Sequence, residues 1–380
     1  MRSVSIAGVG LTQVSEHWER SLADLFVEAA VKAIEDAGVG DPEAVYVANS
    51  GSSYIQGQLN LGAMMADALG KAGTPAFTVE AGAASGAVAF HEGVKAVASG
   101  LYDIVLVGGV EKVSDASPEE IACFLSMPED QEYTAYTGIT NFGLNALIYR
   151  HYMERFGVRQ EDIAMLAVRC HEHAEGCPHA MYPFKLSLER ILSSPMEADP
   201  LHILECSGTG DGAAAVIIQP SKGVDGEVEV AAYSLSTDLT HITERPDIVT
   251  FEAVKRASEK AFRMAGISRR DVDVVEIHDE TTITGIISLE DMGFAEKGKG
   301  ATLFTGQEPA AGGKPHVNTF GGLKARGNPV GATGLYQIVE IAMQLEGEAG
   351  RCQVDKPEFG LAQSLGGLGS TCAITILRRH

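Results

Sequence analysis

One local pattern occurs twice in this chain, at positions far apart. Apolar residues at helical spacing over 22–38 end at a glycine and lead into an apolar run over 44–49. The same order returns over 251–266, again ending at a glycine, and is followed by a run over 272–277. Helical spacing before a glycine predicts a helix and its end, and a short apolar run predicts a buried strand. We therefore expect two copies of one folding unit.

A pair of apolar helices supports this duplication. One opens at Ala-Ser-Gly in 84–86 and ends at Gly100, and the other opens at Ala-Thr-Gly in 332–334 and ends at Gly347. Both are apolar around most of their circumference, which predicts helices buried between layers.

Glycine-led strands over 211–218 and 368–376 close the two copies. Strands that alternate with helices predict an α/β fold with parallel-rich sheets covered by helices. The halves run over 1–225 and 226–380 by this pattern, and a chain of 380 residues is long enough for two cores.

An insertion over 114–204 has no counterpart in the second half. It contains a helical stretch over 142–156, another over 161–174, and a loop rich in His, Pro and Cys. Long insertions on a repeated scaffold commonly carry substrate specificity, so we expect this segment to line an acyl pocket.

The composition argues against several classes of partner. Against 29 basic residues stand 51 acidic ones, a net charge of −22, which repels nucleic acid and anionic membranes. The N-terminus lacks the long apolar run of a signal peptide, and no stretch has the length of a membrane span. The 6 cysteines form no spaced framework, which favours a reducing, cytoplasmic location.

The stretch over 79–87 is typical of a strand that runs into a tight turn and opens a helix. Many α/β enzymes mount a nucleophile on such a turn, because the helix N-terminus stabilises negative charge beside it. This turn, Glu-Ala-Gly-Ala-Ala-Ser-Gly, contains no strong nucleophile.

Three segments resemble the thiolase superfamily, especially the branch of archaeal acetoacetyl-CoA thiolases and sterol-carrier-protein thiolases. VEAGAASG over 79–86 is similar to the family's nucleophile loop, VEAACASG. EIHDET over 276–281 is similar to the HDxF-type loop, and VNTFGGLKARGNPVGATG over 317–334 to the glycine-rich loop that ends in GHPxGATG. The resemblance covers nearly the whole chain. It implies a thiolase fold of two βαβαβαββ halves in αβαβα layers, with a coenzyme A thioester as the substrate.

Three positions depart from the family pattern. Ala83 stands where the family has its acylated cysteine, Asn328 where it has the activating histidine, and Glu280 where this branch often has a second cysteine. Ala83 cannot form an acyl-enzyme. We consider a natural origin of Ala83 more favoured than a deliberate replacement that traps substrate, because replacement would leave Asn328 unexplained.

The remaining residues suit carbon–carbon cleavage without covalent attachment. Asn328 can donate a hydrogen bond to a thioester oxygen but cannot accept a proton, and His278 offers a second donor or a base. In a retro-aldol reaction a base removes the β-hydroxyl proton and the donors hold the resulting enolate. The base candidates are His278 and Glu280, with Tyr336 a weaker one. Steroid side-chain retro-aldolases, which resemble thiolases and lack the usual cysteine, give a family precedent.

Two alternatives stay open beside this lyase. The chain can be a true acyl-CoA C-acyltransferase that recruits another group, or a non-catalytic subunit that supports an active partner. Of the cysteines, Cys123 lies in the insertion and Cys206, Cys352 and Cys372 flank or occupy expected strands, so we expect all of them to be small buried residues.

Other polar motifs have plainer interpretations. Lys324 and Arg326 can meet the phosphates of coenzyme A, although solvated loop charges are commoner, and Gly367 suits a close backbone approach to a thioester. We expect no metal at the cluster Cys170, His171, Glu172, His173, Cys177 and His179, because adjacent side chains on a helix point in different directions. Asp279 is expected to cap the helix that follows it.

The resemblance also implies partners. Members of this branch are at least homodimers, and they often work with a small subunit that carries a zinc ribbon and an OB-fold. We expect both here, together with an acyl-CoA substrate.

Overall fold

Ten strands form one hydrogen-bonded series, made of a first and a second five-stranded sheet that are joined by the short pairing of β1 with β8. The computed structural model describes residues 2–306 and 315–380. The strands of the first half are β1 (Val4–Leu11), β2 (Ala44–Ala48), β3 (Ala76–Val79), β4 (Val105–Glu111) and β7 (Gly212–Pro220). Those of the second half are β8 (Val228–Thr237), β9 (Val274–Glu276), β10 (His316–Val317), β11 (Phe359–Gly366) and β12 (Thr371–Arg379).

The strand order is symmetric about the pairing of β1 with β8. It runs β10-β9-β11-β12-β8-β1-β7-β4-β2-β3, so each strand of one half has a counterpart in the other. Only two residue pairs join β1 to β8, Ser5 with Glu229 and Ile6 with Val228. The paired segments expected from the sequence occupy matching places in this order, which confirms the duplication. The exact division at 225 and 226 stays a prediction.

The expectation of parallel-rich sheets is wrong. In each half the two outer pairings are parallel, and the two pairings nearer the centre are antiparallel. The reason is clearest at β11 and β12, since the short turn over 367–370 folds one strand back on the other as a hairpin.

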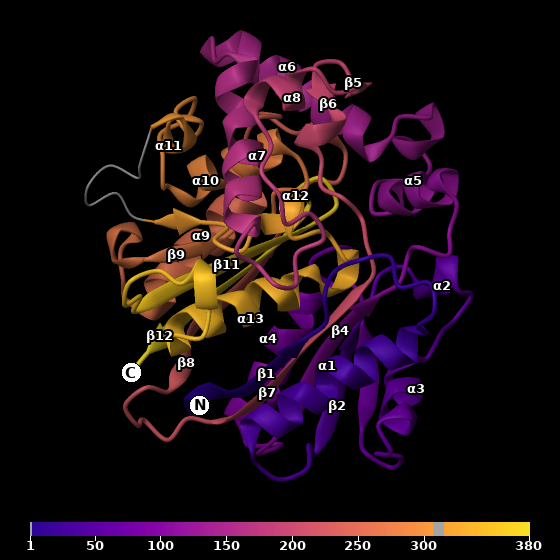
Figure 1. Ribbon diagram of the computed structural model, residues 1–380, viewed down its shortest axis with the longest axis vertical. Helices are drawn as coiled ribbons and strands as arrows, with labels where there is room; N and C mark the ends of the chain where they lie inside the picture. The colour runs from indigo at the N-terminus through magenta and orange to yellow at the C-terminus, as the bar shows by residue number, and fades with distance from the viewer. Residues whose placement is uncertain (1, 307–314) are drawn as a thin grey trace.

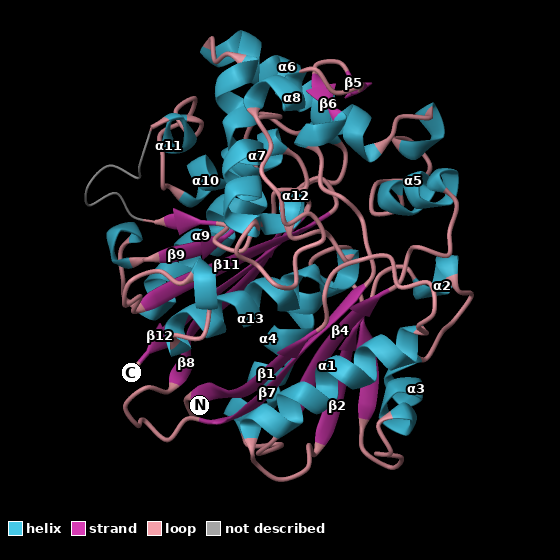
Figure 2. Ribbon diagram, viewed as in Figure 1, coloured by secondary structure: helices cyan, strands magenta, loops and turns pink. Residues whose placement is uncertain are grey.

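Helices cover both sheets and fill the space between them (Figures 1 and 2). Against the first sheet lie α1 (Leu22–Ala37) and α3 (Leu61–Ala68) on its outer face. Between the sheets run α4 (Ser85–Ser99) and α13 (Thr333–Glu346), and α9 (Glu252–Ala265) and α10 (Thr282–Met292) cover the far face of the second sheet. This αβαβα layering is the thiolase arrangement implied by the sequence.

The two central helices touch at the glycines that open them. A Cβ on Gly86 of α4 would lie 2.7 Å from the backbone nitrogen of Leu335, and one on Gly334 of α13 would lie 2.6 Å from that of Ala87. Both distances are too short for carbon, so this approach requires glycine on both helices. The shared Ala-Ser/Thr-Gly pattern is therefore explained by the close contact between α4 and α13.

The insertion forms a helical cap over one end of the sheets (Figure 1). Its elements are α5 (Pro118–Ser126), η1 (Ala135–Thr137), α6 (Asn141–Phe156), α7 (Gln160–Ala174), α8 (Leu188–Leu192), β5 (Met196–Ala198) and β6 (Leu201–His202). The two longer helices confirm the stretches expected near 142–156 and 161–174. Outside the insertion, short helices are α2 (Ser52–Ile55), α11 (Thr302–Thr305) and α12 (Gly322–Ala325).

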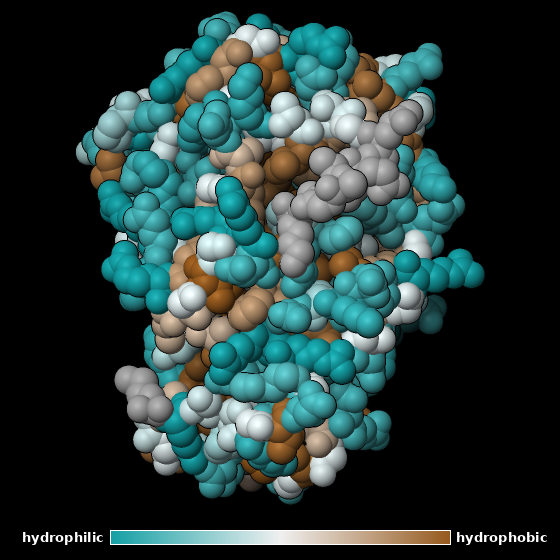
Figure 3. Space-filling model, turned by 90° about the vertical axis from the view of Figure 1, so that its left-hand side faces the viewer, coloured by the Kyte–Doolittle hydropathy of each residue, from teal (hydrophilic) through white to brown (hydrophobic). Residues whose placement is uncertain are grey.

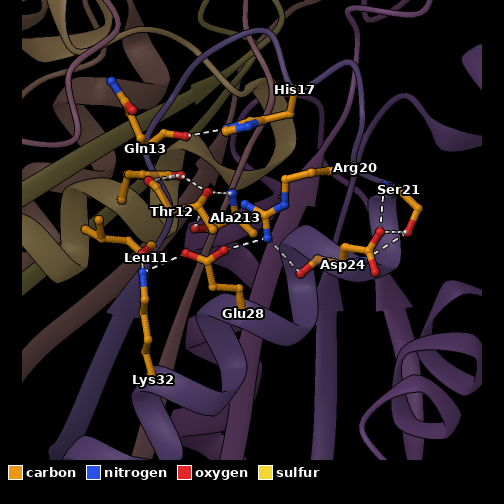
Figure 4. A network of polar contacts seen from close by, with 11 residues as sticks. Leu11, Thr12, Gln13, His17, Arg20, Ser21, Asp24, Glu28, Lys32 and Ala213 are labelled. Carbon is orange, nitrogen blue, oxygen red and sulfur yellow. Dashed lines mark hydrogen bonds and ion pairs between the residues drawn. The ribbon is translucent and has the colours of Figure 1, made fainter.

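Polar contacts fix the chain between β1 and α1 (Figure 4). Ser21 and Asp24 cap α1 reciprocally, each side chain accepting from the other residue's backbone N–H. Farther along the helix, Lys32 donates to the carbonyl of Leu11 at the end of β1 (3.0 Å). Thr12, the next residue, exchanges backbone and hydroxyl hydrogen bonds with Ala213 of β7.

Hydrophilic residues cover most of the face drawn in Figure 3. Within 2–306 and 315–380, no helix combines the length and the apolar character that crossing a membrane requires.

Candidate active site

A small cavity of about 20 Å³ brings the three family-like segments together. It lies where the chain leaves β3, β9 and β11, and the C-terminal ends of parallel strands are where α/β folds commonly bind ligands. Its walls comprise Ser50, Ala83, Phe124, Leu125, Pro128, Asn141, His278, Glu280, Val330 and Gly367. The cavity is large enough for about one water molecule.

The turn that carries Ala83 is braced by its own side chains. The hydroxyl of Ser85 accepts from the N–H of Ala81 (2.8 Å) and donates to the carbonyl of Gly82 (2.6 Å). Gly82 has a φ of 59°, a backbone conformation that favours glycine. The turn thus holds position 83 against the cavity, at the start of α4, with a methyl group in place of a nucleophile.

His278 and Glu280 enter the cavity from the loop after β9. The backbone N–H of His278 donates to Gln363 Oε1 (2.8 Å), which ties the loop to β11. Burial lowers the pKa of His278 to about 3, and the positive charge of Arg326 acts in the same direction. The imidazole is therefore neutral near pH 7, with one ring nitrogen as donor and the other as acceptor.

Glu280 has the opposite shift. Burial raises its pKa to about 7, a hydrogen bond from Asn141 opposes this, and the Glu129 carboxyl adds to it. A carboxyl group with this pKa is partly ionised at neutral pH and can both take and return a proton. Of the titratable groups that line the cavity, Glu280 is the better placed base, because neutral His278 is a very weak one.

Asn328 sits beside the cavity and does not line it. Its Oδ1 accepts from the hydroxyl of Thr333 (2.7 Å), which directs the amide Nδ2 toward Ser207 Oγ (3.4 Å). The backbone N–H of Ser207 donates to the carbonyl of Glu280 (2.7 Å). Ser207 therefore bridges the loop of Asn328 and the loop of Glu280 through one hydrogen bond to each.

The insertion supplies much of the cavity wall. Phe124, Leu125 and Pro128 come from the α5 segment and Asn141 from the start of α6. No local sequence pattern marks any of these residues, nor Ser207, as part of a site. The only signal was the general expectation that this insertion lines the substrate pocket.

Comparison with known proteins identifies the family of the chain. The model of the thiolase N-terminal domain matches residues 4–222, and the thiolase C-terminal domain-like model matches residues 234–379. The chain belongs to the thiolase superfamily. It is 40% identical to an acetyl-CoA acetyltransferase of Methanothermobacter thermautotrophicus, with 100% of both chains covered. It is 31% identical to sterol carrier protein 2 of Homo sapiens, covering 100% of this chain and 72% of the relative.

A solved structure named Ltp2-ChsH2(DUF35) aldolase has the same fold. It superposes with a TM-score of 0.84 over 99% of this chain and 98% of that chain, at 22% sequence identity. The expectations of thiolase-superfamily membership and of the thiolase fold are thereby confirmed.

Three of the expected site residues lie away from the cavity. The Tyr336 hydroxyl donates to the carbonyl of Thr12 (2.9 Å), and burial raises its pKa, so its position does not favour a role as base. Arg326 is fully buried, pairs with Glu340 (3.1 Å) and lies over the ring of Tyr336. Lys324 is buried too. The interpretation of Lys324 and Arg326 as solvated loop charges is therefore wrong, and their contact with coenzyme A phosphates stays a prediction that this burial does not favour.

Asp279 caps a different helix from the expected one. It accepts from the backbone N–H groups of Leu323 (2.7 Å) and Lys324 (3.3 Å), at the start of α12. The helix that follows it in sequence, α10, is capped by Thr281. The reason is that the loop after β9 passes beside α12 before α10 begins, so the nearest free N–H groups are not the nearest in sequence.

The cysteines and histidines of the insertion have separate surroundings. Cys206 and Cys372 are buried as expected, but Cys123 is exposed and Cys352 is partly exposed, so the expectation is wrong for these two. Cys170 and Cys177 are buried too. The histidines of the cluster contact different groups: His171 the carbonyl of Phe184, His173 that of Asn318, and His179 the carboxylate of Glu340.

Proposed function

We propose that this protein breaks or makes the Cα–Cβ bond of an acyl-CoA thioester without binding the acyl chain covalently, by a retro-aldol type of route. The observation that carries the proposal is the composition of the cavity. Ala83, His278 and Glu280 line the same cavity, and none of its ten lining residues is a cysteine. A site with a base and no nucleophile suits lyase chemistry better than acyl transfer through the enzyme.

Glu280 acts as the base in this mechanism. Its carboxylate takes the proton of the β-hydroxyl group, the Cα–Cβ bond breaks, and its electron pair moves into the thioester as an enolate. The β-carbon leaves as an aldehyde or ketone. The protonated Glu280 then returns the proton to Cα, so that a shorter acyl-CoA forms and the enzyme is restored.

Hydrogen-bond donors stabilise the enolate oxygen. Neutral His278 offers one ring N–H, and the Asn328 amide is held beside the cavity by Thr333. We propose that Asn328 and Ala83 stand where other thiolases have histidine and cysteine. A thioester needs more room than about 20 Å³, so substrate entry must displace insertion side chains such as Phe124 and Leu125.

The second candidate is thiolysis with free coenzyme A. Relatives 40% identical over almost their full length are named acetyl-CoA acetyltransferases, which favours it. The solved structure is named an aldolase, which favours the lyase, although at 22% identity the similarity between the two chains is one of fold alone. A silent subunit is the remaining alternative.

One assay separates the three. The purified protein is incubated with a β-hydroxyacyl-CoA and with a β-ketoacyl-CoA, each with and without free coenzyme A, and products are followed by mass spectrometry. Cleavage of the β-hydroxy ester without added coenzyme A, lost in Glu280→Gln and kept in Glu132→Gln, supports the proposal. Strict dependence on coenzyme A supports thiolysis. No product in any arm overturns both and favours the subunit.

We also propose a homodimer. Strand β3 is the last in its sheet, and Phe77 on it is 45% exposed. An edge strand with exposed apolar side chains pairs readily with another strand. Sedimentation should show a dimer that Phe77→Asp converts to monomer.

A small zinc-ribbon and OB-fold subunit is the second proposed partner. The DUF35 component named in the aldolase structure supports it. Co-purification with such a protein from the native source is the test, and a cytoplasmic location remains part of this proposal.

A further inference from the structure

A buried carboxyl group of the insertion contacts the glycine turn beside the active site. Glu129 is 5% exposed, and its Oε1 accepts from the backbone N–H of Leu368 (2.8 Å). The same oxygen lies 3.3 Å from the point where a Cβ on Gly367 would stand. Gly367 lines the cavity, so Glu129 lies directly behind the cavity wall.

Arg245 holds the other side of the same residue. It is 6% exposed, and its Nη1 donates to the carbonyl of Leu368 (2.7 Å), while its Nε donates to the carbonyl of Leu239 (2.9 Å). Leu368 is thus held at its N–H by an acid from the insertion and at its carbonyl by a base from the segment between β8 and α9. The Arg245 contact is charge-assisted, which makes it stronger than a neutral hydrogen bond.

The charge of Glu129 also reaches Glu280. The negative charge of Glu129 adds to the raised pKa of Glu280. Burial raises the pKa of Glu129 itself, and the Leu368 N–H, Arg245 and His241 oppose that rise. Arg245 and the Leu368 N–H favour the ionised form of Glu129. The charge of an ionised Glu129 opposes the ionisation of Glu280.

We propose that Glu129 is a positioning residue that fixes the glycine turn over 366–369 and sets the protonation of Glu280 from behind the cavity wall. The role of Glu280 as base rests on the proposed function, but the contacts of Glu129 do not. The insertion, which has no counterpart in the other half, thereby controls both the shape of the cavity and the state of its base.

Two variants separate the two effects. Glu129→Gln keeps an oxygen that can accept from Leu368 but removes the charge, whereas Glu129→Ala removes both. Glu132→Gln is the matched control, since it removes an exposed carboxylate from the same segment. Folding of each variant is checked by circular dichroism.

The first measurement is independent of turnover. Infrared spectra over a pH series give the protonated carboxyl band of Glu280, identified as the band that Glu280→Gln removes. Glu129→Gln should lower the midpoint of this band by roughly one pH unit, because a like charge is gone. An unchanged midpoint, equal to that of Glu132→Gln, overturns the electrostatic part of the proposal.

The second measurement follows hydrogen exchange in the peptide that contains Leu368. Exchange should be about tenfold faster in Glu129→Ala than in Glu129→Gln, because only the alanine variant loses the acceptor. Equal rates in the two variants overturn the positioning part. If the wild type cleaves β-hydroxyacyl-CoA, the pH profile of kcat/KM should move with the infrared midpoint. Infrared and exchange shifts without any turnover refute the proposed function and leave this inference standing.

Discussion

Replacing Glu280 with glutamine should stabilise the fold above neutral pH while it abolishes turnover. Burial raises the pKa of Glu280 from 4.5 to about 7, because the cavity solvates the ionised carboxylate poorly. Between these two values the folded protein holds a proton that the unfolded chain has released. The wild type therefore loses stability as the pH rises from 4.5 to about 7 and regains none above it.

The size of this loss follows from the two pKa values. At about 1.4 kcal/mol for each pH unit, the displacement corresponds to roughly 3 kcal/mol. Glutamine has nearly the same shape and does not ionise, so the variant does not carry this cost. The free energies of unfolding of the two proteins should be close at acidic pH and differ by roughly 3 kcal/mol at about pH 8 in favour of the variant.

Urea denaturation of wild type and Glu280→Gln at about pH 5 and about pH 8 measures the difference. Other buried acids, such as Asp279, titrate in both proteins and cancel in the comparison. Glu132→Gln serves as the control for loss of a carboxylate and should match the wild type at both pH values. A difference that is the same at both pH values, or a variant less stable at the higher one, would refute the assignment of a buried, desolvated base.

Three further substitutions test the scaffold and the cavity. Asp211→Asn weakens a buried carboxylate that accepts hydrogen bonds at 2.6 to 2.9 Å, and should cost about 2 kcal/mol or more in urea denaturation at neutral pH. Gly334→Ala places a carbon 2.6 Å from the Ala87 nitrogen and should cost about 1 to 3 kcal/mol, whereas Gly40→Ala, with its nearest contact at 3.5 Å, should leave the melting temperature unchanged. Ala83→Cys places a thiol in the cavity with His278, whose pKa of about 3 makes it a poor base for the thiol proton, so intact-protein mass spectrometry after acetyl-CoA treatment should show no adduct. An adduct would show that the cavity activates thiols.

The duplicated architecture could be predicted from the sequence because its signals are local. The glycine that ends α1 and the one that ends α9 follow helix-periodic residues, and the expected strands after them are β2 and β9. The directions of the strands could not be predicted in the same way. Whether β12 runs parallel or antiparallel to β11 depends on how the chain returns to the sheet, and an alternation of strands and helices suggests only crossovers.

The candidate site was predictable only where one segment carries its own signature. Ala83, His278, Glu280 and Gly367 line one cavity, and each lies in or next to a recognisable turn. The burial of Arg326 could not be predicted, because a charged residue in a loop is usually solvated.

Contacts between segments far apart in the sequence could not be predicted either. The acceptor of the Leu368 N–H is more than two hundred residues away in sequence, at Glu129. No local pattern marks a carboxylate that will pack behind a turn from the other half of the chain. The same holds for Ser207, whose role is visible only once the loops of Glu280 and Asn328 lie side by side.

The core that stabilises the fold and the cavity that carries the candidate site are built from different parts of the chain. The contact between α4 and α13 and the mirrored strand order come from both halves alike, whereas the cavity takes Ala83 from the first half, Glu280 from the second and Asn141 from the insertion. A buried base such as Glu280 costs stability, and the symmetric core is what offsets that cost. Exchanging a cavity side chain, including a nucleophile for alanine, leaves the glycine contacts of the central helices untouched. Under the proposed function, the same core would support acyl transfer in one chain and non-covalent cleavage in another, with the difference confined to a few turns and to the insertion that packs behind them.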